Sequence, residues 1–261
     1  MLVQKRLPLR RFLKLPVQIL LLALTLTGTA CFDRVFQSGP LKHDSVSIGA
    51  AVGDVDSLRL EINTRTCVTR LDLGVGSGSL VEGSFNYNFP EWKPDVSYTN
   101  RVKMEVLIES PSCVGMVDDT SPQNDWSLLV NGAVPLTLIV DHDMSYYAVG
   151  PTDFDLRGLS LRELEMRLGD DKGYQVDLSG AWVQGFNGRI ESVEGAVTLL
   201  LPDMVGVFVE VDGLTANQID AGVFTAEGDG YKNAAYDMAA VSIHLTLSSE
   251  KGIFILQEIE E

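Results

Sequence analysis

Apolar and polar side chains alternate along most of the chain from residue 57 onward. In residues 57–65, Leu58, Leu60 and Ile62 occupy one set of alternate positions, and charged residues occupy the other. The same alternation recurs in residues 70–76 and 102–110. A period of two is typical of a β-strand with one buried face and one hydrated face. The pattern therefore predicts an all-β protein.

Residues 159–169 consist mainly of residues that favour helices. Their apolar residues Leu164, Met166 and Leu168 nevertheless alternate strictly with charged neighbours. Because this period is that of a strand, we predict a strand here as well.

The second half of the chain contains a degenerate repeat of strand, turn and strand. Its units begin at Pro135, Arg162, Gly188 and Ala240, a spacing of about 26 residues with one slot skipped near residue 214. Residues 207–213 fill that slot with an alternating run that ends in an Asp-Gly turn. Such a repeat indicates stacked rungs, each of which buries its apolar face against its neighbours. We predict a β-solenoid-like stack of short strands in residues 121–261 and a smaller N-terminal β module in residues 57–120.

The stretch RLDLGVGSGSLVEG, residues 70–83, carries three glycines spaced two apart. A phosphate-binding loop would need a following helix and a Gly-Lys-Ser/Thr or GxGxxG pattern, neither of which is present. The stretch is therefore predicted to be a tight turn between two strands. Asn131-Gly132 and Asn187-Gly188 are likewise predicted as turns that need a positive φ.

The first 30 residues have a basic head, a short apolar body and small residues at the end, which is the pattern of a secretory signal peptide. The apolar run is short for a membrane span, although an uncleaved N-terminal anchor is the alternative. Residues 31–56 lack sustained periodicity and are predicted to be a tether.

The predicted export determines how the three cysteines of the chain are interpreted. Cys31 comes directly after Gly-Thr-Ala, which resembles a bacterial lipobox, so we predict that it is lipidated; ordinary cleavage after Ala30 is the alternative. Cys67 and Cys113 form an even pair in a compartment where disulfides persist, and we predict a disulfide between them, with two buried free thiols as the alternative.

Composition and motifs argue against most chemistries. The formal net charge of -16 repels phosphate backbones, so nucleic acid is not an expected partner. No CxxC or GxSxG sequence is present, and we predict no catalytic residue, metal site or cofactor. His142 lies between Asp141 and Asp143 and could contribute to a cation site, but a solvated turn between rungs is the favoured interpretation.

Aromatic residues are the main candidates for partner contacts. Phe85, Tyr87 and Phe89 alternate along one strand face, and the favoured role of this group is internal packing. The alternative is an exposed patch that binds a partner. Adjacent strand residues point in opposite directions, so one of two neighbouring tyrosines is expected to face solvent. The candidate partner-binding residues are Trp92, Tyr98, Tyr146 and Tyr147.

Several segments resemble the bacterial toast-rack family. LDLGVGSGSL, FNYN and PEWKPDVSY (residues 90–98) are similar to its N-terminal module, with WKPDVSY the most specific part. The segments starting at Asn124, Phe154 and Leu199 are similar to its repeated main module. The resemblance implies an envelope location and a β-solenoid, and it implies no shared catalytic residues. Related domains occur in regulators of envelope-stress kinases and in surface proteins.

The sequence therefore predicts a non-catalytic exported protein of the cell envelope. We expect a lipoprotein that contacts the membrane through its N-terminal lipid and presents the β-solenoid as a binding or scaffold surface for an envelope protein or polymer. Two alternatives remain open at this point, a regulator of an envelope-stress-sensing kinase and an enzyme that acts on envelope polymers.

Overall fold

The computed structural model describes residues 35–49, 54–65, 68–111, 116–117, 122–143, 152–169 and 172–260. The predicted signal peptide, the three cysteines and the pair Tyr146 and Tyr147 lie outside these residues. Almost all described elements are strands; two short 3-10 helices, η3 (Pro90–Trp92) and η4 (Ala216–Gln218), accompany them. The predicted all-β fold class is confirmed.

Two large sheets contain nearly all the strands. A ten-stranded sheet has the spatial order β18 (Thr225–Glu227), β19 (Gly230–Lys232), β16 (Gly206–Asp212), β20 (Ser242–Ser249), β14 (Phe186–Ser192), β12 (Leu161–Leu168), β10 (Leu136–His142), β3 (Ser57–Asn63), β7 (Lys103–Glu109), β6 (Asp95–Tyr98). A nine-stranded sheet has the order β17 (Ile219–Asp220), β21 (Ile253–Ile259), β15 (Ala196–Pro202), β13 (Tyr174–Asp177), β11 (Thr152–Asp155), β4 (Arg70–Gly76), β9 (Asn124–Asn131), β5 (Val81–Tyr87), β2 (Lys42–Ile48). A third, small sheet pairs β1 (Val35–Phe36) with β8 (Met116–Val117).

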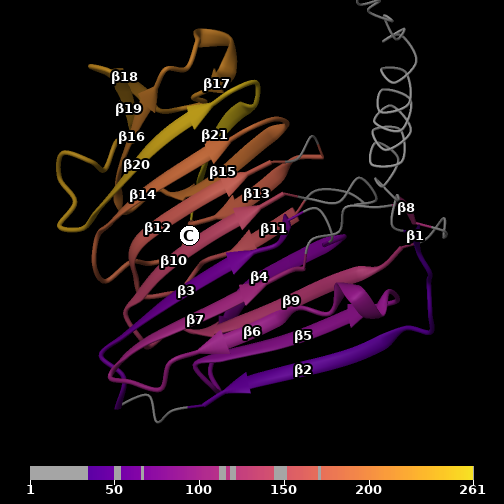
Figure 1. The fold of residues 1–261 in the computed structure, drawn as a ribbon. Coiled ribbons are helices and arrows are strands. Elements are labelled where there is room, and N and C mark those ends of the chain that lie inside the picture. Colours follow the sequence, from indigo (N-terminus) through magenta and orange to yellow (C-terminus); the bar gives the residue numbers. More distant parts are fainter. Residues whose placement is uncertain are drawn as a thin grey trace, which may run out of the picture.

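The predicted repeat corresponds to rungs that give one strand to each large sheet. The four repeat units become β10 with β11, β12 with β13, β14 with β15, and β20 with β21. Within each sheet these strands pair in parallel with the strands of the neighbouring rungs. The stacked layers are visible in Figure 1.

The register aligns apolar side chains that point between the two sheets. Leu60 of β3 pairs with Leu138 of β10, which pairs with Leu164 of β12. All three are buried and belong to one continuous core. Burying a leucine contributes about 1.5–3 kcal/mol, so each aligned row contributes substantially. The segment rich in helix formers is β12, as its alternation predicts: Leu164, Met166 and Leu168 are buried.

The spatial order of the rungs differs from their order along the chain. The pair β20 and β21, last in sequence, lies between the rung of β14 and β15 and the strands β16 and β17. Similarly, β3 lies between β10 and β7. In Figure 1, indigo β3 therefore sits among strands of later colour. The alternating run at residues 207–211 does form a strand, β16, but it pairs with β20 and not with β14.

Antiparallel strands end the ten-stranded sheet on both sides and the nine-stranded sheet on one side, whereas the other end of the nine-stranded sheet is the parallel strand β17. At one end β19 pairs with β16, and β18 follows it. At the other end β6 pairs with β7, while β5 and then β2 extend the opposite sheet beyond β9. Because a free strand edge is a template for further pairing, these end strands determine what the molecule exposes.

The structure differs from one local expectation, and it confirms another, the turn in the glycine stretch, with an unexpected strand pairing. Residues 42–48 of the predicted tether form β2, a strand that pairs with β5 over its whole length. The glycine stretch does connect two strands, β4 and β5, but β9 lies between them and hydrogen-bonds to both. Asn131 at the end of β9 reaches the connection, where its side-chain amide donates to the carbonyl of Gly78 at 3.2 Å.

Glycine positions were predicted correctly only in part. Gly132 and Gly188 do not have a positive φ, and Gly188 lies inside β14. Gly213, in the predicted Asp-Gly turn, does have one, at +74°. Strands from both sides of residue 121 share both large sheets, as β3 and β10 show. The division into modules at that residue stays a prediction.

Gly188 provides a test of the aligned core. It lies in the apolar row between Leu164 and Leu245, and a Cβ there would come within 2.7 Å of Leu245 Cδ2. We expect Gly188→Val to lower the free energy of unfolding by about 1–3 kcal/mol because it overpacks the core. Gly74→Val is the matched control, since its Cβ would meet Leu129 Cδ2 at an ordinary 3.6 Å on the hydrated face. Denaturant titration measures both, and equal effects would contradict the register described above.

Candidate binding site

The aromatic group of the N-terminal half is mostly internal. Phe85, Tyr87 and Phe89 are buried, which confirms the packing role. Trp92 is only 2% exposed and packs on Phe89 with ring centroids 4.4 Å apart. The prediction of Trp92 as a partner contact is therefore wrong. Its ring is buried against Phe89, where a partner cannot reach it.

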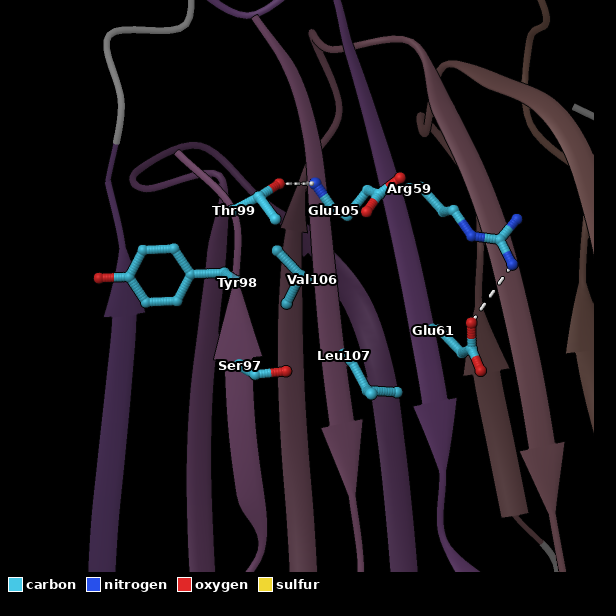
Figure 2. Close-up of a pocket in the computed structure, with 8 residues that line it drawn as sticks. All are labelled: Arg59, Glu61, Ser97, Tyr98, Thr99, Glu105, Val106 and Leu107. Carbon is cyan, nitrogen blue, oxygen red and sulfur yellow. Dashed lines mark hydrogen bonds and ion pairs between the residues drawn. The ribbon is translucent and has the colours of Figure 1, made fainter. Parts of the chain in front are cut away.

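Tyr98 is the exposed member of the group. It ends β6 and is 57% exposed. It pairs with Val106, which is buried, so the side chain of Tyr98 stands on the side of the sheet that faces the core. Figure 2 shows its ring projecting beyond β6, away from β7 and β3. An aromatic side chain on the core-facing side is exposed here because the sheet ends at β6.

A hollow of about 330 Å³ lies beside β6 at this end of the ten-stranded sheet. Thr99 Oγ1 accepts a hydrogen bond of 3.2 Å from the main-chain N–H of Glu105, and Arg59 forms an ion pair of 3.2 Å with Glu61 (Figure 2). Both members of the ion pair are about half exposed, so a ligand can compete for either. The lining residues are Arg59, Glu61, Ser97, Tyr98, Thr99, Glu105, Val106 and Leu107.

A second hollow of about 360 Å³ lies between the edges of the two sheets. Lys93 Nζ lies 2.9 Å from Asp44 Oδ2, and the Tyr87 hydroxyl donates to the same oxygen at 2.7 Å. These hydrogen bonds from Lys93 and Tyr87 lower the pKa of Asp44. Burial, with the nearby Asp44 carboxylate, raises the pKa of Tyr87 to about 12. The lining residues are Asp44, Ser45, Val46, Phe85, Lys93, Pro94, Asp95 and Val96.

Tyr98 stays a predicted partner contact, and its exposure is compatible with that role, but sequence reasoning missed the β2 side of this end. Asp44 and Val46 were assigned to the tether, although Asp44, Val46 and Ile48 alternate with polar residues. That alternation is a weak strand signal, because the run contains only two aliphatic side chains. Tyr146 and Tyr147 lie outside the described residues, and so do Cys31, Cys67 and Cys113.

His142 does not form a cation site with its neighbours. Its ring is fully buried, with Nδ1 2.7 Å from Thr64 Oγ1 and Nε2 3.5 Å from Thr152 Oγ1. Asp141 instead pairs with Arg167 at 3.3 Å. The favoured interpretation of a solvated turn is also wrong for His142, because it ends β10 inside the stack. In the part of the chain that the structure describes, no group of three or more His, Cys, Asp or Glu side chains could hold a metal ion.

The comparisons with known proteins define the class of protein. The family described as the N-terminal domain of toast_rack matches residues 37–200. The chain belongs to this family, as the sequence resemblance indicated. None of the described residues forms a helix long and apolar enough to cross a membrane.

One solved structure in particular shares the fold. The chain is similar to the crystal structure of a "putative cell adhesion protein" from Clostridium sporogenes, with 24% identity, a TM-score of 0.71 and coverage of 85% of this chain and 100% of that chain. A "putative adhesin" from Bacteroides fragilis matches at 9% identity and a TM-score of 0.30, with coverage of 85% and 99%. Comparison with curated proteins found no match.

Acid should destabilise the protein through His142. Burial lowers the pKa of its imidazole from 6.5 to about 3, so between these values the unfolded state binds the proton more readily than the folded state. The free energy of unfolding should therefore decrease as the pH is lowered below about 6.5. The His142 imidazole contributes up to about 1.4 kcal/mol to this decrease for each pH unit. His142→Asn should be less stable at neutral pH but should lack this component, as denaturant titrations across the range will show.

The control for this titration is Gly188→Val, which is expected to lower stability but removes no titratable group. It should leave the pH slope as in the wild type. Asp143 and Tyr174 are the titratable neighbours, and burial raises the pKa of Asp143, which adds a slope of opposite sign. Both are present in all three proteins, so the slopes can be compared directly. An unchanged slope in His142→Asn would contradict the assignment.

Proposed function

We propose that this chain is a non-catalytic protein of the cell envelope that is exported, held to a membrane by a lipid on Cys31, and used as a binding or scaffold surface. The observation that carries the binding role is the end of the stack formed by β2 and β6. There the exposed Tyr98 lines one hollow, and Val96 of the same strand lines a second. The proposed partner is an envelope protein or polymer.

Family membership and the N-terminal sequence support the location. The basic and apolar segments of residues 1–30 precede Cys31, as in exported lipoproteins. The similar solved structure from Clostridium sporogenes carries a name that refers to cell adhesion, which fits a role outside the cytoplasm. Several acyl chains would hold the protein more firmly than one, since a single chain anchors only weakly.

The disulfide between Cys67 and Cys113 remains part of the proposal. The described residues next to them support it: the Ser110 main-chain N–H donates to the Asn63 carbonyl at 2.8 Å, and the Ser110 hydroxyl donates to the Thr64 carbonyl. Thr64 and Ser110, the first residues after β3 and β7, therefore lie next to each other, and each stands three residues before a cysteine.

Mass spectrometry tests the disulfide. In a Cys31→Ser background, alkylation without reduction should leave the protein unlabelled, and reduction should add two labels. Replacing both cysteines by Ala should cost up to about 4 kcal/mol in the free energy of unfolding, on the chain-entropy estimate. Two labels before reduction would show free thiols and contradict the bond.

Lipidation of Cys31 has a direct test. We expect the wild type in the membrane fraction, with an N-terminal peptide that begins at Cys31 and carries acyl mass. Cys31→Ser should move the protein to the soluble exported fraction because the lipid is the anchor. Cys67→Ser is the control and should stay with the membrane. An unmodified wild-type N-terminus would refute the anchor.

The binding role is tested by crosslinking in intact cells. A photoreactive amino acid at Tyr98 should give discrete adducts, whereas one at Val223, which is 71% exposed in the loop between β17 and β18, should not. Equal labelling from both positions, or none from Tyr98, would argue against a binding surface at this end.

A further inference from the structure

The two sheets end unequally where β2 and β6 lie. Beyond the rung formed by β7 and β9, the nine-stranded sheet continues with β5 and β2, but the ten-stranded sheet continues only with β6. β6 has four residues and β2 has seven. In the described part of the chain, β2 therefore faces a position in the opposite sheet that no strand fills. The hollow between the sheet edges lies there, lined by β2 on one side and by residues 93–96 on the other.

The free edge of β6 presents main-chain groups to this position. The main-chain N–H of Thr99 donates to the carbonyl of Glu105 at 2.9 Å, so these two residues form a hydrogen-bonded pair between β6 and β7. Hydrogen-bonded and non-hydrogen-bonded pairs alternate along an antiparallel ladder. The N–H and C=O groups of Val96 and Tyr98 therefore point away from β7, toward the unfilled position.

Apolar side chains line the same position from both sheets. Val96 and Tyr98 pair with Ile108 and Val106, which are buried, so both stand on the core-facing side of β6. Val46 of β2 lies across the hollow from Val96 and is only half-buried, and the ion pair of Asp44 with Lys93 lines the same hollow. An added strand would cover these side chains, as each inner strand of the stack does for its neighbours. Among the described strands, β2 also ends its sheet, but none lies in the opposite sheet where it could face a strand added beyond β2.

The outward side of β6 carries an acidic residue, Asp95. On β7 next to it, Glu105 and Glu109 have basic neighbours: Lys103 lies on the same face, Arg59 of β3 is paired with Glu105 in the register, and Arg65 lies 3.8 Å from Glu109. A strand added to β6 would place its outward side chains beside Asp95, and opposite charges on neighbouring strands attract.

From these observations we propose that β6 accepts an extended peptide of a partner protein as an additional antiparallel strand. The peptide places apolar side chains over Val46 and Val96, and basic side chains outward beside Asp95. This inference rests on the proposed binding role and names the partner chemistry: a segment in which apolar and basic residues alternate. Main-chain hydrogen bonds provide affinity in this mode of recognition, and the alternate pockets provide specificity.

The test uses the purified protein and the synthetic peptide Lys-Val-Lys-Val-Lys-Val-Lys. We expect saturable binding by isothermal titration calorimetry at physiological salt. The same peptide with N-methylated valines keeps its charge but loses the N–H groups that would face Val96 and Tyr98. It should bind at least about tenfold more weakly, since several hydrogen bonds are lost. Equal binding of both peptides would overturn the proposal, because it would show attraction by charge alone.

Two variants test the protein side. Val96→Pro removes an N–H that points to the free edge and leaves the bonds to β7 intact, so the fold should persist while affinity falls about tenfold or more. Tyr98→Ala changes an exposed side chain, keeps the fold, and should also weaken binding. Val223→Ala, far from β6, is the control and should bind as the wild type does. Wild-type affinity in both Val96→Pro and Tyr98→Ala would refute strand addition.

The oligomeric state shows whether a second copy of this chain, and not a partner peptide, occupies the position beside β6. If sedimentation shows a dimer that Val96→Pro converts to monomer, a second copy fills the position and the peptide proposal is wrong. The proposed function can fail separately. If Tyr98 crosslinks to a partner in cells but the purified protein does not bind the peptide, the binding role stands and strand addition is rejected. If the purified protein binds the peptide but Tyr98 gives no adducts in cells, strand addition stands and the proposed cellular binding role is rejected.

Discussion

The structure depends on the in-register stacking of apolar side chains between two sheets. Each rung supplies only one strand to each sheet, so it cannot bury its apolar face alone and relies on the rungs beside it. Rows such as Leu60, Leu138 and Leu164 exist only because the parallel strands are aligned without slippage at these positions. A slip of one residue would turn every such side chain toward water. Register is therefore the quantity that this sequence specifies most strongly.

This dependence makes the order of the rungs important. The strands last in sequence, β20 and β21, are interior members of the stack, with β16 beyond β20. β3, the first strand of the parallel stack, is interior as well, between β7 and β10. Segments distant in sequence must therefore meet before the stack is complete. Loss of either segment would open a gap within the core and not merely shorten the stack, which ties the chain into one cooperative unit.

Sequence periodicity predicted the features that are set by local alternation. β12 was recognised despite its helix-forming residues, because Leu164, Met166 and Leu168 alternate with charges. The position of β9 between β4 and β5 could not be read in this way, since it depends on pairing partners and not on the alternation of either strand. Trp92 was misjudged because the residue type does not reveal whether an aromatic side chain outside a regular strand is buried or faces a partner. β2 was missed because a strand at a sheet edge needs few apolar residues.

At each end of the stack, the core-facing side chains of the last strands must be covered, and the two ends differ in how this is done. At the end formed by β16 and β20, a hairpin of β18 and β19 covers the last strand, and Leu214, Ile219 and Tyr231 pack against the core. At the other end the nine-stranded sheet runs one strand further than its partner sheet. Among the described residues, core-facing side chains of β2 consequently have no strand opposite them in the other sheet. In a stack of repeated rungs, the surface differs from rung to rung mainly at the ends. At this end the two sheets stop at different strands, so the edge of β6 beside Tyr98 differs from the rest of the stack.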